Sequence, residues 1–436
     1  MRWVLGAVAV LALAYAFELG LLVYAMLVLL GVLAVSRVMT REWIDRLEVD
    51  RECSRLQCAQ GDKVAVLVHL HNTSRWLSIG WLLVEDSIPR EALTQRPPRI
   101  ELDGRRTALL QLGPQGRDSL RYQVRFLMRG YYQLGPVLLE SGDFFGLHRR
   151  FRIETRPQFV LVTPRVIPLA GFEIASRRPL GEVRLAHRLF EDPTRISGVR
   201  EYQPGDPLRR VHWKASARTG VLHSKQYEAS SVVGVTLVLD FHSDQYPARE
   251  EPNRSELAVT TVASLANAVC LLGRQVGLVT NARDAADRIR EEGYTGEFRT
   301  RTLARQVAEG TGRSDRLRPV IVPTRRGPEQ FTRIQETLAR AELTDGLTLA
   351  QLLVEAASQL PRNATVVAVV PAASEQTALA LGGLVRRGYT VVAIHVLPDE
   401  QTNHVDASRL LAAGVEVLPL PDEAALATLC AAVALR

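Results

Sequence analysis

The feature that most constrains this chain is its first 35 residues, because so long an apolar run has to be withdrawn from water. From Trp3 to Val35 the residues are almost all apolar, and Glu18 is the only charged one. One helix of this length would measure roughly 50 Å, whereas the hydrocarbon core of a bilayer is about 30 Å thick. Two helices therefore accommodate the run better than one.

The natural place for a break is Phe17-Glu18-Leu19-Gly20, which divides the run into two segments of about 17 residues, each just long enough to span. The sequence therefore predicts a transmembrane helical hairpin over residues 1–38. Basic residues flank it on both sides: Arg2 before it, and Arg37, Arg41 and Arg46 after it. By the positive-inside rule, both termini are expected in the cytoplasm. A cleaved signal peptide fits less well, because the run is too long for an h-region and no small-residue cleavage site follows.

Residues 41–162 carry the signals of short strands. Ser119–Phe126 alternates strictly between polar and apolar residues, and Lys63–Leu70 has the same period of two. Three further runs are separated by connections that contain Pro or Gly: Gly80–Val84, Thr107–Leu112 and Gly135–Glu140. Such spacing predicts an antiparallel β-sandwich of the immunoglobulin or fibronectin kind.

Residues 233–436 show a different period. Apolar strands alternate with amphipathic helices, which predicts a doubly wound α/β sheet. The expected strands are Gly234–Asp240, Val276–Thr280, Ala364–Val370, Thr390–Leu397 and Val415–Leu420, and the expected helices are Ser255–Arg274, Leu347–Leu360, Ser374–Arg387, Ala407–Ala413 and Glu423–Val433. Because ligands of such sheets bind outside the carboxyl ends of the strands, Asp240 is a candidate site residue.

A basic segment, residues 163–232, connects the two domains. Between Arg149 and Lys225 there are 16 basic and 7 acidic residues, a net charge of +9, whereas the whole chain carries +7. Such a segment could contact anionic lipid or nucleic acid. Acids, aromatic residues and a Pro-Gly turn are interleaved with the bases, however, which favours local pairing and packing over nucleic-acid binding.

Three motifs in this region carry a family resemblance. They read Gly-Val-Arg-Glu-Tyr-Gln-Pro-Gly-Asp at 198–206, Arg-Val-His-Trp-Lys-Ala-Ser-Ala-Arg at 210–218 and Lys-Gln-Tyr-Glu at 225–228. Together with Arg129–Pro136 and Asp143–Leu147, they resemble the bacterial domain of unknown function 58 family, which more often has Pro in place of Phe144. The resemblance covers nearly the whole chain. It implies a protein anchored in the bacterial inner membrane, with a von Willebrand factor A-like domain, encoded beside MoxR-type AAA+ ATPases.

The signature residues allow two roles. As a scaffold, Pro204-Gly205-Asp206 would form a turn and Trp213 would anchor the segment into a sheet. As a docking surface, an exposed set of Arg, Tyr and Trp would bind a partner protein. The candidate partner-binding residues are Arg200, Tyr202, Gly205, Asp206, Arg210, Trp213, Lys214, Ser216, Arg218 and Glu228.

The von Willebrand A-like resemblance also implies a metal-ion-dependent adhesion site, which departs from its usual pattern here. Asp240 keeps the first ligand of Asp-x-Ser-x-Ser, but His242 and Asp244 replace the two serines. Thr348 matches a coordinating Thr, while Val370-Pro371-Ala372-Ala373 stands where a later Asp is usual. Asp240, Asp244 and Thr348 are therefore the candidate ligands of a Mg²⁺ ion. Alternatively, Asp240 caps a helix or pairs with an Arg.

Motifs of catalysis are missing from the sequence: it has no phosphate-binding P-loop, Gly-x-Ser-x-Gly elbow, His-Glu-x-x-His or Gly-x-Gly-x-x-Gly. The expected function is therefore non-enzymatic. The first hypothesis is a membrane-anchored adaptor that works with a MoxR-type AAA+ ATPase in the assembly or maturation of a client complex. The alternative is a divalent-metal-dependent adhesion or sensor module of the cell envelope.

Overall fold

The fold is described by a computed structural model over residues 2–143, 148–169, 191–202, 211–229, 234–292, 316–361, 364–396 and 400–427. Its internal contacts divide the chain into two compact units. The first unit comprises Met1–Arg165, Arg283–Asp315 and Gln335–Glu342, and the second comprises Val166–Ala282, Arg316–Ile334 and Leu343–Arg436. Several predicted features extend beyond the described residues, among them the Asp143–Leu147 motif after its first residue, the 198–206 motif after Tyr202, and the last helix, Glu423–Val433.

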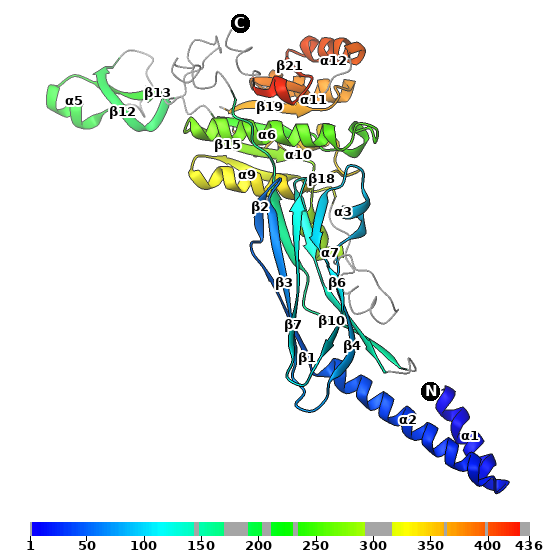
Figure 1. Cartoon of the computed structure of the whole chain (residues 1–436). Helices are drawn as coiled ribbons and strands as arrows, with labels where there is room; N and C mark the ends of the chain where they lie inside the picture. The colour runs from blue at the N-terminus through cyan, green and yellow to red at the C-terminus, as the bar shows by residue number, and fades with distance from the viewer. Residues whose placement is uncertain are drawn as a thin grey trace. The chain divides into compact units, whose positions relative to one another are not determined.

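The apolar start of the chain forms two helices, α1 (Arg2–Ala16) and α2 (Gly20–Asp45), and Figure 1 shows α1 folded back along α2. The predicted break between them is confirmed, because Glu18 adopts a left-handed φ of 57°. Among the described residues, α2 alone is long and apolar enough to cross a membrane, with a mean hydropathy of 2.3. The 15 residues of α1 reach only about 22 Å. The structure thus supports one membrane-spanning segment where the sequence predicted two.

Helix α2 continues to Asp45, past the predicted end at residue 38, and its last turns pack onto the β-strands of the first unit. The Ser36 hydroxyl is buried and donates a hydrogen bond to Asp143 Oδ2 (2.6 Å), and His148 Nδ1 lies 3.0 Å from the same hydroxyl. Near the end of the helix, Arg152 donates a hydrogen bond to the Ile44 carbonyl. These contacts fix α2 to the strands that follow.

The strands of the first unit between residues 47 and 163 form three sheets. The strands are β1 (Leu47–Cys53), β2 (Gln57–Ala59), β3 (Lys63–Asn72), β4 (Ile79–Asp86), β5 (Ile100–Gly104), β6 (Thr107–Leu112), β7 (Arg117–Phe126), β8 (Gly130–Leu134), β9 (Val137–Gly142), β10 (Arg149–Glu154) and β11 (Gln158–Thr163). Two four-stranded antiparallel sheets have the orders β1-β3-β7-β5 and β10-β9-β4-β6, and β2-β11-β8 forms the third. A short helix, α3 (Arg90–Thr94), follows β4. The five predicted strands overlap β3, β4, β6, β7 and β9, and the antiparallel β prediction is confirmed.

The core of these sheets follows from the period of two. In β3, every second residue from Val64 to Leu70 is no more than 1% exposed. Tyr122 and Phe126 point inward from the neighbouring β7, where Val66 pairs with Tyr122. Trp43 of α2 is buried in the same core, which joins the end of the helix to the sheets.

An ion pair lies inside this apolar core. Arg51 Nη1 lies 3.1 Å from Asp86 Oδ1, and both side chains are at most 1% exposed. Tyr122 donates a hydrogen bond to the other carboxylate oxygen of Asp86 (2.7 Å), and Arg51 also donates to the Arg156 carbonyl (2.6 Å). Burial raises the pKa of Asp86, and the Arg51 charge and the Tyr122 hydrogen bond offset part of that rise.

The second unit contains a six-stranded sheet with the order β17-β15-β14-β19-β20-β21. Its strands are β14 (Gly234–Leu239), β15 (Gln275–Thr280), β17 (Val320–Arg325), β19 (Ala364–Val370), β20 (Val391–Val396) and β21 (Glu416–Leu420), and the helices between them include α6 (Asn253–Leu271), α10 (Leu349–Ala356), α11 (Glu375–Arg386) and α12 (Glu400–Ala412). All neighbouring strands are parallel except β17, which runs antiparallel to β15. The mixed α/β prediction is confirmed, and β17 is an addition to it.

Several elements were not predicted from the sequence. Helix α9 (Pro328–Arg340) follows β17, and its residues fall in both units. The first unit also holds α7 (Ala285–Glu292) and the small pair β16 (Arg283–Asp284) and β18 (Ala341–Glu342). In the signature segment, β12 (Glu191–Glu201) and β13 (His223–Ala229) pair as antiparallel strands, and α5 (Trp213–Thr219) lies between them in the chain.

Candidate functional site

The sheet of the second unit has one place where its chain connections change direction. From β14 the chain passes through α6 to β15 on one side, and it later returns to β19 on the other side of β14. In open α/β sheets, ligands bind outside the carboxyl ends of the strands at such a switch point. Asp240 directly follows β14, and Ser374 follows β19 by four residues. This edge is the leading candidate site of the unit.

A cavity of about 440 Å³ opens at this edge. Nine of its eleven lining residues are polar or charged, and the lining comprises Asp240, His242, Asp244, Gln245, Thr348, Leu349, Ala350, Ser374, Glu375, Gln376 and Thr377. Two helices begin in its wall. Thr348 caps α10 in a capping box with Gln351, and the Ser374 hydroxyl accepts a hydrogen bond from the Thr377 amide to cap α11 (3.2 Å). Their partial positive charges face a lining that already holds three carboxyl groups, those of Asp240, Asp244 and Glu375.

Asp240 is buried beside this cavity and only 2% exposed. Its Oδ1 accepts hydrogen bonds from Asn281 Nδ2 (3.0 Å) and from the His242 amide (3.3 Å). Asn281 is itself held in place, since it accepts a bond from the Phe241 amide and donates one to the Leu347 carbonyl. Burial raises the pKa of Asp240 above its ordinary value, and the two hydrogen bonds and His242 lower it only in part.

The structure brings the three predicted metal-ligand candidates to the same cavity, but their donor atoms fit a resident Mg²⁺ ion poorly. The Thr348 hydroxyl is engaged with Gln351 in the helix cap, and Oδ1 of Asp240 accepts two hydrogen bonds. Asp244 extends into solvent with 79% of its side chain exposed, and its Oδ2 lies 3.9 Å from His242 Nδ1. Within the described ranges, no group of three or more His, Cys, Asp or Glu side chains is arranged to hold a metal ion.

Sequence reasoning did not identify two polar residues of this edge, Asn281 and Ser374. Asn281 supplies the amide that bonds Asp240, and Ser374 supplies a helix cap in the cavity wall. Each closely follows a predicted parallel strand, so the rule that selected Asp240 could also have selected them.

The signature segment forms a compact hairpin held by local hydrogen bonds. The Tyr202 amide donates to the Leu222 carbonyl (2.8 Å), and the His212 amide donates to the His223 carbonyl (2.8 Å). Ser216 is structural here, because its hydroxyl donates to the His212 carbonyl and accepts from the His223 amide. His212 caps α5 by accepting from the Ala215 amide.

Trp213 projects from this hairpin with 67% of its surface exposed, so it does not anchor the segment into a sheet. Lys214 and Arg218 of the same helix are also exposed. Val221 (50%) and Leu222 (46%) extend the apolar surface beside them. Three signature candidates, Gly205, Asp206 and Arg210, lie outside the described residues, and Arg200 and Glu228 are described in their backbone alone.

The Arg129–Pro136 motif has structural roles within the first unit. Arg129 is buried, and its Nη1 donates hydrogen bonds to the carbonyls of Leu338 (2.7 Å) and Ala341 (2.9 Å). Gly135 has a φ of +83°, and a Cβ there would lie 1.9 Å from the Arg51 guanidinium. Glycine is therefore required beside the buried ion pair.

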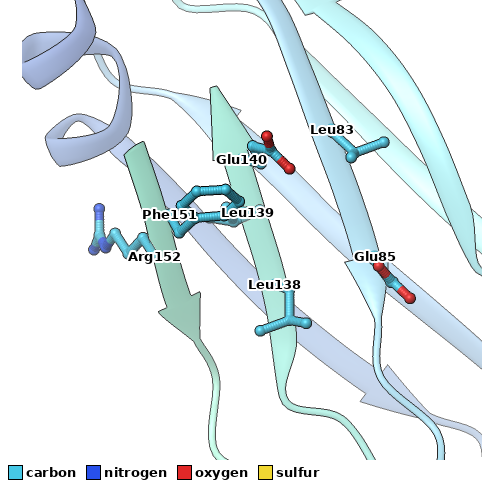
Figure 2. Close-up of a pocket in the computed structure, with 7 residues that line it drawn as sticks. All are labelled: Leu83, Glu85, Leu138, Leu139, Glu140, Phe151 and Arg152. Atoms are coloured by element: carbon cyan, nitrogen blue, oxygen red, sulfur yellow. The ribbon is translucent and has the colours of Figure 1, made fainter. Parts of the chain in front are cut away.

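A small cavity on the β4–β9–β10 sheet is a poorer candidate. Figure 2 shows the Leu83, Leu138 and Phe151 side chains that line it on adjacent strands. Its volume is about 10 Å³. That volume holds roughly one water molecule, so no larger ligand is expected there.

Comparisons with known proteins give one family match. A family described as "Protein of unknown function DUF58" matches residues 198–316. The protein described as "Uncharacterized protein YeaD" from Bacillus subtilis (strain 168) is 24% identical over 242 residues, which cover 54% of this chain and 56% of that protein. The chain therefore spans about half the length of this curated relative.

Comparisons with solved structures return weak likenesses. One is the CARDB domain of the PF1109 protein from Pyrococcus furiosus, which is 14% identical. The aligned region covers 27% of this chain and 91% of the CARDB chain, with a TM-score of 0.17. Spo0M, a sporulation control protein from Bacillus subtilis, is 11% identical and covers 36% of this chain and 58% of that one, also with a TM-score of 0.17. Because both scores are far below 0.5, the fold assignment rests on the sheets described above.

Proposed function

We propose that this protein is a non-enzymatic adaptor of the bacterial inner membrane that works with a MoxR-type AAA+ ATPase to assemble or mature a client complex. In this proposal the second unit is a von Willebrand factor A-like domain on the cytoplasmic side. The exposed surface around Trp213 contacts the ATPase.

The observation that carries the proposal is the exposure of Trp213. A large aromatic residue beside Lys214 and Arg218 has the composition of a binding hot spot. Residues 198–316 match the unassigned family, and the hairpin lies at the start of that match. The local hydrogen bonds of α5 hold this surface in place without using the indole for packing.

Membrane anchoring is supported by the length and hydropathy of α2. The finer proposal is that α1 enters the membrane with α2 as a helical hairpin, so that both termini are cytoplasmic. It is supported by the packing of α1 along α2 and by the basic residues on both flanks.

A binding experiment with the full chain tests the ATPase contact. The detergent-solubilised protein is immobilised and incubated with the purified MoxR-type ATPase of the same genome. Trp213→Ala is expected to reduce the retained ATPase about tenfold or more, since a hot-spot truncation costs about 2 kcal/mol. Trp76→Ala, which removes an exposed Trp of the first unit, is the matched control and should retain as much as wild type. Equal retention by both variants, or none by wild type, would contradict the proposal.

The second candidate function is a divalent-metal-dependent adhesion or sensor module that acts through Asp240, Asp244 and Thr348. The shared cavity of these residues favours it, whereas the engaged Thr348 hydroxyl opposes it. Titration with MgCl2 and MnCl2 tests it by calorimetry and by the melting temperature. From the donor geometry we expect no shift. A shift in wild type that Asp240→Asn abolishes would favour this function over the adaptor.

A further inference from the structure

The loop between β3 and β4 is held by several side-chain hydrogen bonds. Asn72, which is buried, donates its side-chain amide to the carbonyls of Leu77 (2.9 Å) and Gly113 (2.8 Å), and its Oδ1 accepts from the Ser74 amide (3.1 Å). Ser74 Oγ accepts from the Leu77 amide (3.0 Å), and Gln115 donates its side-chain amide to the Thr73 carbonyl (2.8 Å). The backbone of residues 72–77 is thus fixed.

This fixed loop presents Trp76 to the outside with 89% of its surface exposed, next to an exposed Arg75. An indole that is held out of the core by a rigid loop costs solvation free energy unless something covers it. Tryptophan is enriched where membranes meet water, because its ring is apolar and its N–H bonds polar groups.

The loop is attached to the end of the candidate membrane-spanning helix. The Thr73 amide (2.9 Å) and the Thr73 hydroxyl (2.7 Å) both donate to the carbonyl of Arg46, the residue that ends α2. The strand register agrees, since Leu47 at the start of β1 pairs with Asn72 at the end of β3. Figure 1 shows α2 meeting the sheets where β1 begins.

The spacing along α2 leaves Trp76 within reach of the lipid headgroups. The apolar stretch of α2 ends at Val35, and Arg46 lies eleven residues further, or about 16 Å along the helix. Trp76 is three residues beyond Thr73, and three residues of chain reach at most about 10 Å. At that full reach the Trp76 backbone would lie about 6 Å from the end of the apolar stretch, and the headgroup layer is roughly 5–8 Å thick on each side.

We propose that the loop of residues 73–77 is a second membrane attachment, in which Trp76 inserts its indole among the lipid headgroups beside α2. Arg75, together with the exposed Arg37 and Arg41 of α2, contacts the phosphates of anionic lipids. The inference rests on the proposed insertion of α2. Two attachments would orient the first unit on the bilayer.

The test uses the full chain in nanodiscs of phosphatidylcholine and phosphatidylglycerol. The emission of Trp76 is obtained as the difference between wild type and Trp76→Phe, and that of Trp213 as the difference from Trp213→Phe. Brominated phosphatidylcholine is the quencher from the membrane side, and iodide is the quencher from water. The Trp76 component is expected at shorter wavelength, quenched by the bromolipid and protected from iodide, while the Trp213 component is quenched by iodide alone.

Two results would overturn the inference, and they are distinguishable. If the chain elutes apart from the nanodiscs, α2 does not insert and the anchoring proposal fails with this one. If the chain stays in the nanodiscs but iodide quenches the Trp76 and Trp213 components equally, the loop faces water and only the present inference fails. Melting temperatures of the two Phe variants equal to wild type confirm that the differences do not come from unfolding.

Discussion

The two units each bury an aspartate, and they stabilise it in different ways. Asp86 lies inside the β-sheets of the first unit against the Arg51 guanidinium and the Tyr122 hydroxyl. Asp240 lies at the edge of the second unit's sheet, where an asparagine amide and a backbone amide are its hydrogen-bond donors. The first carboxylate has a cationic partner in direct contact. The second has neutral donors and borders a cavity of about 440 Å³.

This difference separates a structural carboxylate from a candidate functional one. A buried charge with a matched guanidinium is compensated inside the fold, so its removal should damage folding and little else. A buried carboxyl whose hydrogen-bond donors are all neutral is less fully compensated, and is the better candidate for interaction with a ligand. Burial alone would have ranked the two residues equally, and the identity of their partners distinguishes them.

The largest expected effect comes from breaking the ion pair of the first unit. Arg51→Ala leaves Asp86 buried beside Tyr122 without its cation, and should lower the free energy of unfolding by about 3–5 kcal/mol. Urea unfolding of the full chain, followed by circular dichroism, measures it. Arg55→Ala breaks a half-exposed pair with Asp62 and serves as the control, with an expected loss under about 1 kcal/mol. Equal losses of unfolding free energy in Arg51→Ala and Arg55→Ala would contradict the prediction that the buried ion pair matters more for folding than the half-exposed one.

A smaller effect is expected from disturbing the same pair sterically. Gly135→Ala places a methyl group 1.9 Å from Arg51 Nη1 at a φ of +83°, so the guanidinium has to move. We expect a loss of about 2 kcal/mol, from backbone strain and the displaced cation. Gly113→Ala is the matched control, because no atom lies within 4 Å of its added Cβ. Thermal unfolding of both variants at equal detergent concentration compares their melting temperatures. A melting temperature of Gly135→Ala equal to that of wild type would contradict the expected strain.

The smallest effect, and one of opposite sign, is expected at Asp240. Because its pKa is raised above the ordinary 3.8, the folded state holds this proton more tightly than the unfolded state. The contribution of Asp240 to stability is therefore present below about pH 4 and lost as the pH rises through its folded value. Asp240→Asn should flatten this fall and raise the free energy of unfolding by about 1 kcal/mol near neutral pH.

Melting temperatures from about pH 4 to about pH 8 check the last prediction. Asp244→Asn is the control at the same cavity, and its exposed side chain should leave the pH profile unchanged. If Asp240→Asn instead destabilises the protein as much as Arg51→Ala, Asp240 is as structural as Asp86, and the cavity loses its status as a candidate site.

Much of the fold was predictable where the side-chain period was regular. Apolar residues occupy every second position from Val64 to Leu70 and from Leu120 to Phe126, and both segments form core strands. The antiparallel β17 was missed, because Pro323 and the charged Arg325 interrupt its short apolar run. The amphipathic α9 was missed as well, since it lies in a stretch whose many charges obscure the apolar period.

The candidate site was predictable in part. Asp240 followed from the strand-end rule, but the engagement of the Thr348 hydroxyl in a helix cap depends on the exact backbone path. The exposure of Trp213 could not be predicted, because a single sequence does not tell whether an aromatic residue faces a core or a partner. Pairing between Arg51 and Asp86 likewise joins strands that are 35 residues apart in the chain.

The attachment of α2 at two positions also has a mechanical consequence. The helix is unbroken from Gly20 to Asp45, and it is tied to the first unit through Ser36 and again through the Arg46 carbonyl, about 15 Å apart along its axis. A rod clamped at two points cannot pivot at either one. A change in bilayer thickness would change the tilt of α2. Because α2 is attached to the first unit at two positions, the first unit would then rotate together with the helix.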